Sequence, residues 1–284
     1  MPRDGDSMCG RYTLTLERDE LEDRFGARFA PGADATADSN SGSKAESFTP
    51  RYNMAPSQQL PVITSDAPET IQRFEWGLVP SWADDDAGGI INARAETVAE
   101  KPSFRDAYRQ RTPGGETAES GVGSDAGSEP EPETPAAGRC LVPADGFYEW
   151  TETDDGKQPY RVAFEDDRPF ALAGLWVRRE PEQGAETTQA GLDAFGGGTA
   201  DAPERGPLET FTIVTTEPNE LVADLHHRMA AILDPADERR WLSDDDPSDV
   251  LQPYPAEEMH AYPVSTAVND PSVESPSLVE STRA

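Results

Sequence analysis

The sequence predicts an α+β fold in one domain, in which short antiparallel strands are mixed with short helices. Segments rich in β-branched and aromatic residues are bounded by turn residues, which is typical of strands. Fewer and shorter segments carry the apolar spacing of a helix. The 284 residues show no internal repeat, and their length suits one large domain or two small ones.

Five segments are expected to form strands because β-branched and aromatic residues dominate them. Within the fourth, Asp166 and Asp167 are expected to turn a hairpin between two strands. The segments are "PVIT" (61–64), "IQRFEWGLV" (71–79), "CLVPADGFYEW" (140–150), "YRVAFEDDRPFALAGLWV" (160–177) and "TFTIVTT" (210–216).

Helices are expected in four places. Leu21, Phe25 and Phe29 are spaced by four in the segment 16–29 and predict a helix there. "PSFRDAYRQR" predicts a short helix with Ser103 as its N-cap. Two more are expected in "NELVADLHHRMAAIL" (219–233) and in "PADERRWL" (235–242), the second opened by Asp234 and Pro235.

Four stretches have the composition of surface insertions. They are rich in Gly, Ala, Ser, Asp and Glu and have few large apolar residues, so they cannot bury enough surface to offset the entropy of ordering. We expect loops near 31–49, 112–138, 180–208 and 243–249. The remaining chain, 9–284, is expected to form the single domain behind a short leader, 1–8.

The composition is strongly acidic, with a formal net charge of −31 from 55 acidic and 24 basic residues. Lys44, Lys101 and Lys157 are its three lysines. This composition is typical of a protein from a salty cytoplasm, where carboxylates keep the surface hydrated and molar salt screens their repulsion over about 3 Å. The acidity therefore reflects the solvent and does not exclude a nucleic acid as partner.

Cysteine content and hydropathy indicate a reducing cytoplasm. Cys9 and Cys140 provide no disulfide framework and no zinc-type spacing. The longest apolar run, 169–177, is shorter than the roughly 20 residues that cross a bilayer. The first residues are polar and show no signal peptide.

Polar residues interrupt the apolar segments in four clusters, "MCGRY", "INARAET", "PADGFYEW" and "LHHRM". In a strand, Asn92, Arg94 and Glu96 would share one face. Each cluster also has an ordinary structural explanation. Glu149 could face solvent from an edge strand, and Arg94 and Glu96 could belong to a surface ladder of charges.

The histidine pair in "LHHRM" invites a zinc site with Cys9 and a carboxylate. Adjacent histidines seldom point the same way, so the sequence disfavours a zinc ion shared by His226 and His227. We expect neither a metal nor another cofactor.

Taken together and in order, eight pieces of the chain closely resemble the SRAP family, the SOS response-associated peptidases. The agreement runs from Cys9 to about Glu280, apart from the acidic insertions. It implies a SRAP-like domain with a barrel-like core of mostly antiparallel strands and short peripheral helices. The pieces are "MCGRY", "RYNMAPSQQLPV", "WGLVPSWA", "INARAET", "PSF", "RCLVPADGFYEW", "ALAGLW" and "LHHRM".

Family members crosslink to abasic sites in single-stranded DNA through a cysteine at the start of the mature chain, and Cys9 matches it. Its amine can form an imine with the opened sugar, and its thiolate can then close a thiazolidine ring. A terminal amine has a pKa of about 7.7–8.0, against about 10.4 for lysine, so more of it is neutral near pH 7. An internal cysteine lacks this amine.

The resemblance also implies roles for other residues. His226 is preferred to His227 because the family pattern places the histidine two residues before an arginine. The expected partner is single-stranded DNA with abasic sites, bound by a cytoplasmic monomer that joins the nucleoid when it is on DNA. The implied catalytic residues are Cys9, Asn92, Glu149 and His226, and the implied DNA contacts are Arg11, Asn53, Pro56, Trp76, Arg94, Trp150 and Arg228.

The chain departs from the family in two places. Seven residues precede Met8, whereas the family expects its cysteine at position two. We interpret residues 1–8 as a misplaced start or as a leader that the protein removes itself, and favour the first. The second departure is Ala230, where the family commonly has proline.

Three other functions stay open at this point. An amidotransferase of the N-terminal-nucleophile type also begins Met-Cys-Gly, but no glutamine-binding segment follows here. A thiol peptidase could pair Cys9 with His226. A reader of single strands or of modified bases would form no covalent bond, and strand cleavage by lyase chemistry is also open.

Overall fold

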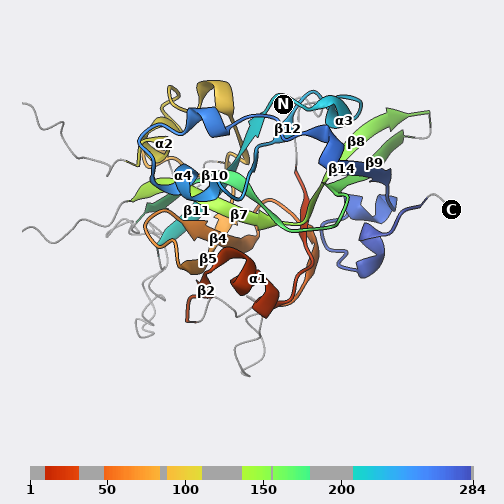
Figure 1. Cartoon of the computed structure of the whole chain (residues 1–284), viewed down its shortest axis with the longest axis horizontal. Coiled ribbons are helices and arrows are strands. Elements are labelled where there is room, and N and C mark those ends of the chain that lie inside the picture. Colours follow the sequence, from red (N-terminus) through yellow and green to blue (C-terminus); the bar gives the residue numbers. More distant parts are fainter. Residues whose placement is uncertain are drawn as a thin grey trace, which may run out of the picture.

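Most of the expected strands form, and five of them close a barrel. The structure, a computed structural model, describes residues 10–31, 48–83, 88–110, 136–154, 156–179 and 207–282. Around the barrel the order is β5-β4-β7-β10-β11, and a parallel pairing of β11 with β5 closes the ring. The strands are β4 (Gln59–Thr64), β5 (Thr70–Trp76), β7 (Ala137–Ala144), β10 (Phe170–Arg179) and β11 (Leu208–Thr216) (Figure 1).

A second, five-stranded antiparallel sheet lies beside the barrel. Its order is β14 (Met259–Pro263), β9 (Gly156–Phe164), β8 (Gly146–Thr153), β1 (Tyr12–Leu14) and β3 (Arg51–Met54). The segment "CLVPADGFYEW" supplies a strand to each sheet, because the chain leaves β7 at Ala144 and begins β8 at Gly146. Asp145 therefore lies at the junction between the two sheets.

Short elements complete the fold. The strands β2 (Arg28–Phe29), β6 (Asn92–Arg94), β12 (Met229–Ala230) and β13 (Ile232–Leu233) pair with barrel strands. The α-helices are α1 (Arg18–Phe25), α2 (Arg105–Tyr108), α3 (Glu220–Ala223) and α4 (Glu238–Ser243). The 3-10 turns are η1 (Ala95–Thr97), η2 (Ser248–Val250), η3 (Ala256–Glu258), η4 (Thr266–Asn269) and η5 (Pro276–Val279).

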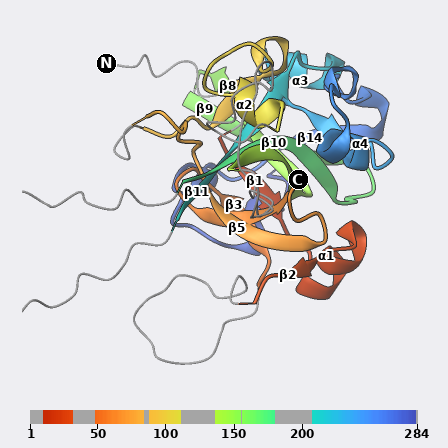
Figure 2. The ribbon, with the colours of Figure 1, turned by 90° about the vertical axis from the view of Figure 1, so that its left-hand side faces the viewer.

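The helices lie outside the sheets, with α1 on one side of the barrel and α2 and α3 on the other (Figures 1 and 2). Within the described residues, no helix is long and apolar enough to cross a membrane. The expected α+β class, with sheets dominant and short helices at the periphery, is confirmed.

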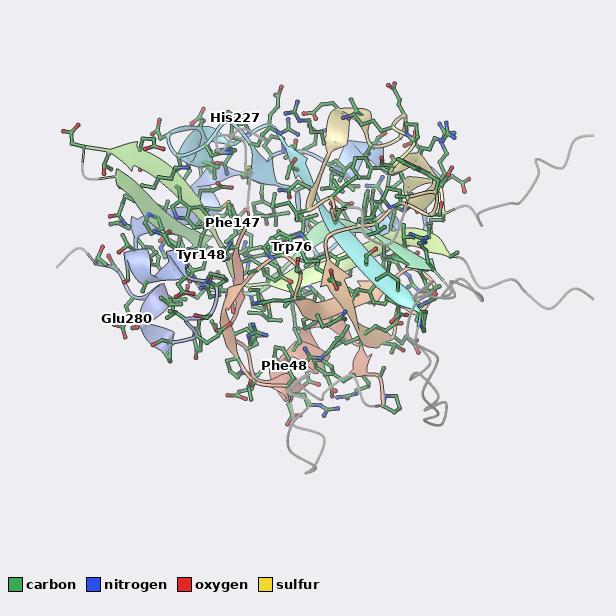
Figure 3. All side chains as sticks on the ribbon, turned by 180° about the vertical axis from the view of Figure 1, so that it is seen from behind. Phe48, Trp76, Phe147, Tyr148, His227 and Glu280 are labelled. Carbon is green, nitrogen blue, oxygen red and sulfur yellow. The ribbon has the colours of Figure 1, made fainter. Side chains whose placement is uncertain are left out.

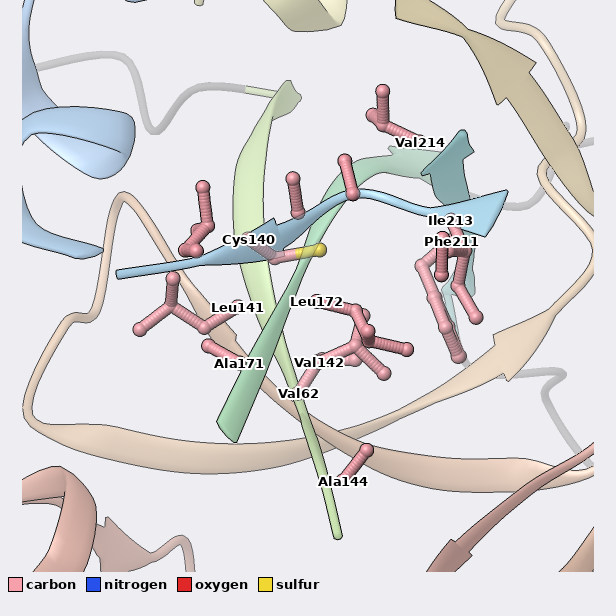
Figure 4. Close-up of a cluster of buried hydrophobic side chains, with 14 of the residues drawn as sticks. Val62, Cys140, Leu141, Val142, Ala144, Ala171, Leu172, Phe211, Ile213 and Val214 are labelled. Carbon is pink, nitrogen blue, oxygen red and sulfur yellow. The ribbon is translucent and has the colours of Figure 1, made fainter. Parts of the chain in front are cut away.

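The barrel interior is the main hydrophobic core (Figure 4). Val62, Val142, Leu172 and Phe211 come from four different barrel strands and are all buried. Cys140 points into the same cluster, where burial raises the pKa of its thiol. This cysteine is therefore a core residue, held as a neutral thiol.

Several expected boundaries are wrong. The first helix ends at Phe25 because Gly26 takes a left-handed conformation with φ of 62°, and Phe29 lies in β2. Ser103 is not an N-cap, since α2 begins at Arg105 after Phe104. The 31–49 insertion ends earlier than expected, because Phe48 is buried and stacked on Phe29.

The other expected insertions are corrected at their ends. Residues 137–138 belong to β7, and residue 208 begins β11. The charged loop 243–249 is tied to the fold, because Tyr108 donates a 2.6 Å hydrogen bond to Asp246 and the buried Arg139 donates to the Asp244 carbonyl. The interiors of the other three, with the leader 1–8, lie mostly outside the described residues.

Candidate active site

Glu149 is a buried carboxylate in the middle of β8. Its strand lies between β1 and β9, where Glu149 pairs with Tyr160. Only 1 % of the Glu149 side chain is exposed, although Trp150 beside it is half-buried. Burial of a charged group is costly unless a partner compensates it. The structure therefore excludes the alternative of a solvent-facing edge glutamate.

His226 lies beside this carboxylate. Asn219 caps α3 by accepting a hydrogen bond from Val222, and the His226 backbone N–H then donates to the Val222 carbonyl at 2.8 Å. These backbone contacts place the His226 ring next to Glu149, with 4.0 Å between Nδ1 and Oε2. His227 is exposed at the outer surface (Figure 3). The structure pairs His226, rather than His227, with the buried carboxylate.

Two backbone atoms of Arg228 lie close to Nδ1 of His226. Both its nitrogen and its carbonyl oxygen lie 3.2 Å from Nδ1. When Nδ1 is unprotonated, the N–H donates to it, and when Nδ1 carries a proton, the carbonyl oxygen accepts from it. The geometry suits a histidine that takes up and releases a proton.

The "INARAET" cluster begins on a strand and ends in a turn. β6 runs parallel to β11, with Asn92 opposite Ile213 and Ala93 buried between two more accessible neighbours. Asn92 and Arg94 share a face as expected, and Arg94 is exposed. Glu96 does not share this face, because it lies in η1.

The Arg228 guanidinium is already bound within the protein. It pairs with both carboxylate oxygens of Glu96, at 2.5 and 2.9 Å, and donates to the Thr215 carbonyl at 2.6 Å. The hydrogen bonds from Arg228 lower the pKa of Glu96. These contacts take up three of the five N–H groups of the guanidinium.

A pocket of about 240 Å³ lies where the described chain begins. Gly10, Arg11, Trp150, Lys157 and Asn269 line it. The Trp150 indole donates a 2.7 Å hydrogen bond to the Asn269 side chain, which fixes the plane of the ring. Burial lowers the pKa of Arg11. Arg11 and Lys157 place two cations at a pocket of a very acidic protein.

Comparison with known proteins shows the family of the chain. The sequence model of the family described as "SOS response associated peptidase (SRAP)" matches residues 8–112 and 133–271. The chain belongs to the SRAP family. Among its relatives, "Abasic site processing protein YoqW" of Bacillus subtilis is 36 % identical, over 96 % of this chain and 100 % of that protein.

Other SRAP relatives and solved structures extend the comparison. "Abasic site processing protein HMCES" of Gallus gallus is 29 % identical, over 92 % of this chain and 74 % of the relative. A crystal structure of a protein from Bacteroides thetaiotaomicron has a TM-score of 0.66 at 24 % identity and covers 96 % of this chain and 99 % of that one. This last likeness shows the fold alone.

Two SRAP-motif residues expected at DNA lie in the core instead. Asn53 is fully buried, and its amide donates to the carbonyls of Val268, Asp270 and Val273, which fastens the C-terminal segment. Trp76 is also fully buried and donates to the Ile91 carbonyl at 2.9 Å (Figure 3). Neither side chain has exposed surface for a base.

Of the remaining SRAP-motif residues, the structure describes Pro56 and does not describe Cys9. Pro56 is half-buried, and it is not among the residues that line the pocket at Gly10. Cys9 lies outside the described residues. Sequence reasoning missed Lys157 and Asn269, which no motif marks, and also Trp82, the second tryptophan of "WGLVPSWA". Trp82 is 67 % exposed, which is unusual for a ring of that size.

Proposed function

We propose that this SRAP protein captures abasic sites in single-stranded DNA as a thiazolidine on Cys9 and thereby shields them. The observation that carries the proposal is the pair formed by the buried Glu149 and the half-buried His226, with 4.0 Å between Oε2 and Nδ1. The backbone carbonyl of Arg11, two residues after Cys9, accepts a 3.0 Å hydrogen bond from the backbone N–H of Tyr148, the residue before Glu149 in β8. The printed names of the relatives support the choice of lesion.

The chemistry balances without a cofactor. The Cys9 amine adds to the aldehyde carbon of the opened sugar, and loss of water gives an imine. The thiol then adds to the same carbon, forming the C–S bond, and its proton ends on nitrogen. Glu149 and His226 exchange the protons, and Asn92 holds the open sugar. Ring closure is intramolecular and gains the effective concentration of pre-oriented groups.

The strand is held by phosphate contacts and by stacking. Arg94 is exposed beside the site, and Arg11 lines the pocket with Lys157. Trp150 and Trp82 offer ring faces to bases, and each stacked base contributes about 1–3 kcal/mol. We place DNA contacts at these residues, whereas Asn53 and Trp76 support the site from the core.

The Cys9 amine has to be free for this reaction. We propose that the mature chain begins at Cys9, either because Met8 is the true start and is removed or because the protein cleaves its own leader. The family match supports this, since it begins at residue 8. The intact mass of purified protein tests it, because an abundant product that retains residues 1–8 would contradict it.

The decisive experiment uses mature protein and a uracil-containing single strand treated with uracil glycosylase. A denaturing gel should show a shifted band with wild type and none with Cys9→Ala. Cys140→Ala is the matched control, because this thiol is fully buried and should leave the adduct unchanged. Blocking the terminal amine alone should also abolish the band, and an unchanged yield would overturn the mechanism.

The same assay separates the alternatives. Protection of abasic DNA by Cys9→Ala at the wild-type level would indicate a non-covalent reader. A shortened DNA strand would indicate lyase activity, and cleavage of an unrelated peptide would indicate a peptidase acting in trans. Salt gives a further test, because raised salt should slow capture and leave finished adducts intact.

A further inference from the structure

The Arg228 side chain ties together the ends of three neighbouring strands. At Thr215, β11 pairs with β6 through Arg94 and with β12 through Ala230. Glu96 follows β6, and Arg228 precedes β12. The guanidinium therefore spans the end of β11, where it binds the Glu96 carboxylate and the Thr215 carbonyl.

This anchor fixes one side of the loop that carries His226. On the other side, the His226 backbone donates to the Val222 carbonyl at the end of α3. Between the two anchors lies His227, which is exposed. The Arg228 side chain is 10 % exposed, so its guanidinium has little room to move. The position of the Arg228 backbone, and with it both contacts to Nδ1, depends on this anchor.

We propose that Arg228 and Glu96 are positioning residues, which hold the Arg228 backbone so that His226 can gain and lose a proton without turning away from Glu149. The proposal rests on the proposed function and deepens it. It assigns Arg228 a task that its contacts in the structure already perform.

The charged groups around the His226 imidazole affect how easily it takes up a proton, and this gives a test of the proposal. Glu149, His227 and Arg228 face His226 directly, while Glu96 and Arg94 lie behind Arg228. In Glu96→Gln the Arg228 charge loses its counter-charge, and an uncompensated cation disfavours protonation of a neighbouring imidazole. Protonation of His226 should therefore begin at a lower pH in Glu96→Gln. The pH at which the crosslinking rate changes because of this protonation should move down with it.

The experiment measures crosslinking rates of mature Glu96→Gln against DNA concentration and pH. The maximal rate should fall by about 10- to 100-fold, because small displacements of a catalytic group have effects of this size. The DNA concentration for half-maximal rate should stay close to that of wild type. Glu217→Gln is the matched control, since Glu217 lines the same surface pocket as Glu96 and loses the same charge.

Two further measurements keep the proposal falsifiable. Nitrogen NMR of the His226 ring should show a hydrogen-bonded Nδ1 in wild type and loss of that signature in Glu96→Gln. Glu96→Asp should recover part of the rate. If Glu96→Gln unfolds, Arg228→Lys serves instead, because lysine cannot form the bidentate pair.

Several results would overturn the proposal. A wild-type rate and pH profile in Glu96→Gln would show that the pair does not position His226. Tighter DNA binding and faster capture would show that Glu96 competes with phosphate for Arg228. Absence of any adduct with wild type would refute the proposed function, and the ring NMR would still decide whether the pair orders His226.

Discussion

Two carboxylates of equal burial lie four residues apart, Asp145 between the sheets and Glu149 in β8. Both are 1 % exposed. Asp145 accepts hydrogen bonds from the side chains of Thr13 and Thr15, at 2.5 and 2.7 Å, and from the Thr15 backbone, and it pairs with the buried Arg161. Glu149 faces His226 across 4.0 Å.

Burial alone does not mark a reactive carboxylate. Asp145 is saturated by donors that fasten β1 to the junction between the sheets, so we assign it a structural role. Glu149 faces a group that can itself gain or lose a proton, so proton exchange is open to it. Substitutions at the two positions should therefore have opposite signatures.

The largest expected effect is on rate, in Glu149→Gln. An amide cannot exchange the protons of imine formation, and loss of a general acid–base group lowers rates by about 10²–10⁴-fold. The free energy of unfolding should change by less than about 1 kcal/mol, because a neutral amide is easier to bury than a carboxylate. Crosslinking time courses and denaturant titration measure the two quantities.

The opposite result would be a Glu149→Gln protein that is largely unfolded while its remaining folded fraction reacts at the wild-type rate. That result would make Glu149 a structural residue like Asp145. Thr151→Val provides a control in the same strand, two residues beyond Glu149 and half-buried.

Asp145→Ala should show the reverse signature. Asp145→Ala removes the buried counter-charge of Arg161, whose other ion pair, with Asp167, is mostly exposed to solvent. Breaking a buried ion pair in this way costs about 3–5 kcal/mol. We expect this loss in the free energy of unfolding by urea titration, with the capture rate of the folded fraction lowered less than in Glu149→Gln. An unchanged midpoint would contradict the structural role.

The sequence predicts the strands of the barrel well, because their β-branched and aromatic runs are local signals. The family motifs also select Glu149 and His226, and the structure brings these two side chains within 4.0 Å of each other. The sequence misses the pairing of Glu96 with Arg228, because the two are 132 residues apart and the contact depends on strand order. It misplaces Trp76 for a similar reason, since an aromatic motif does not say which side of a strand faces the core.

The pocket at Gly10 offers a smaller, salt-dependent effect. Lys157→Gln removes one cation from the rim and leaves the Glu149–His226 pair in place. If Lys157 contacts one phosphate, the logarithmic dependence of capture on salt at low DNA concentration should become shallower by about 0.7. Arg239→Gln, an equal charge change on an exposed residue of α4, should leave the slope unchanged. Equal slopes for the two variants would remove Lys157 from the interface.

The smallest expected effect on stability concerns Glu96, which differs from the two buried carboxylates because 47 % of its side chain is exposed. Its hydrogen bonds from Arg228 lower its pKa in the folded protein, below the value of about 4.3 expected in the unfolded chain. The pair therefore stabilises the fold above about pH 4.3, and this contribution is lost as the pH falls through the lower, folded value. Solvent screening limits it to less than about 1 kcal/mol. The free energies of unfolding of wild type and Glu96→Gln, measured by urea titration, should differ by a constant amount near neutral pH and converge in acid. If their difference does not change with pH down into acid, the ion pair contributes nothing to stability.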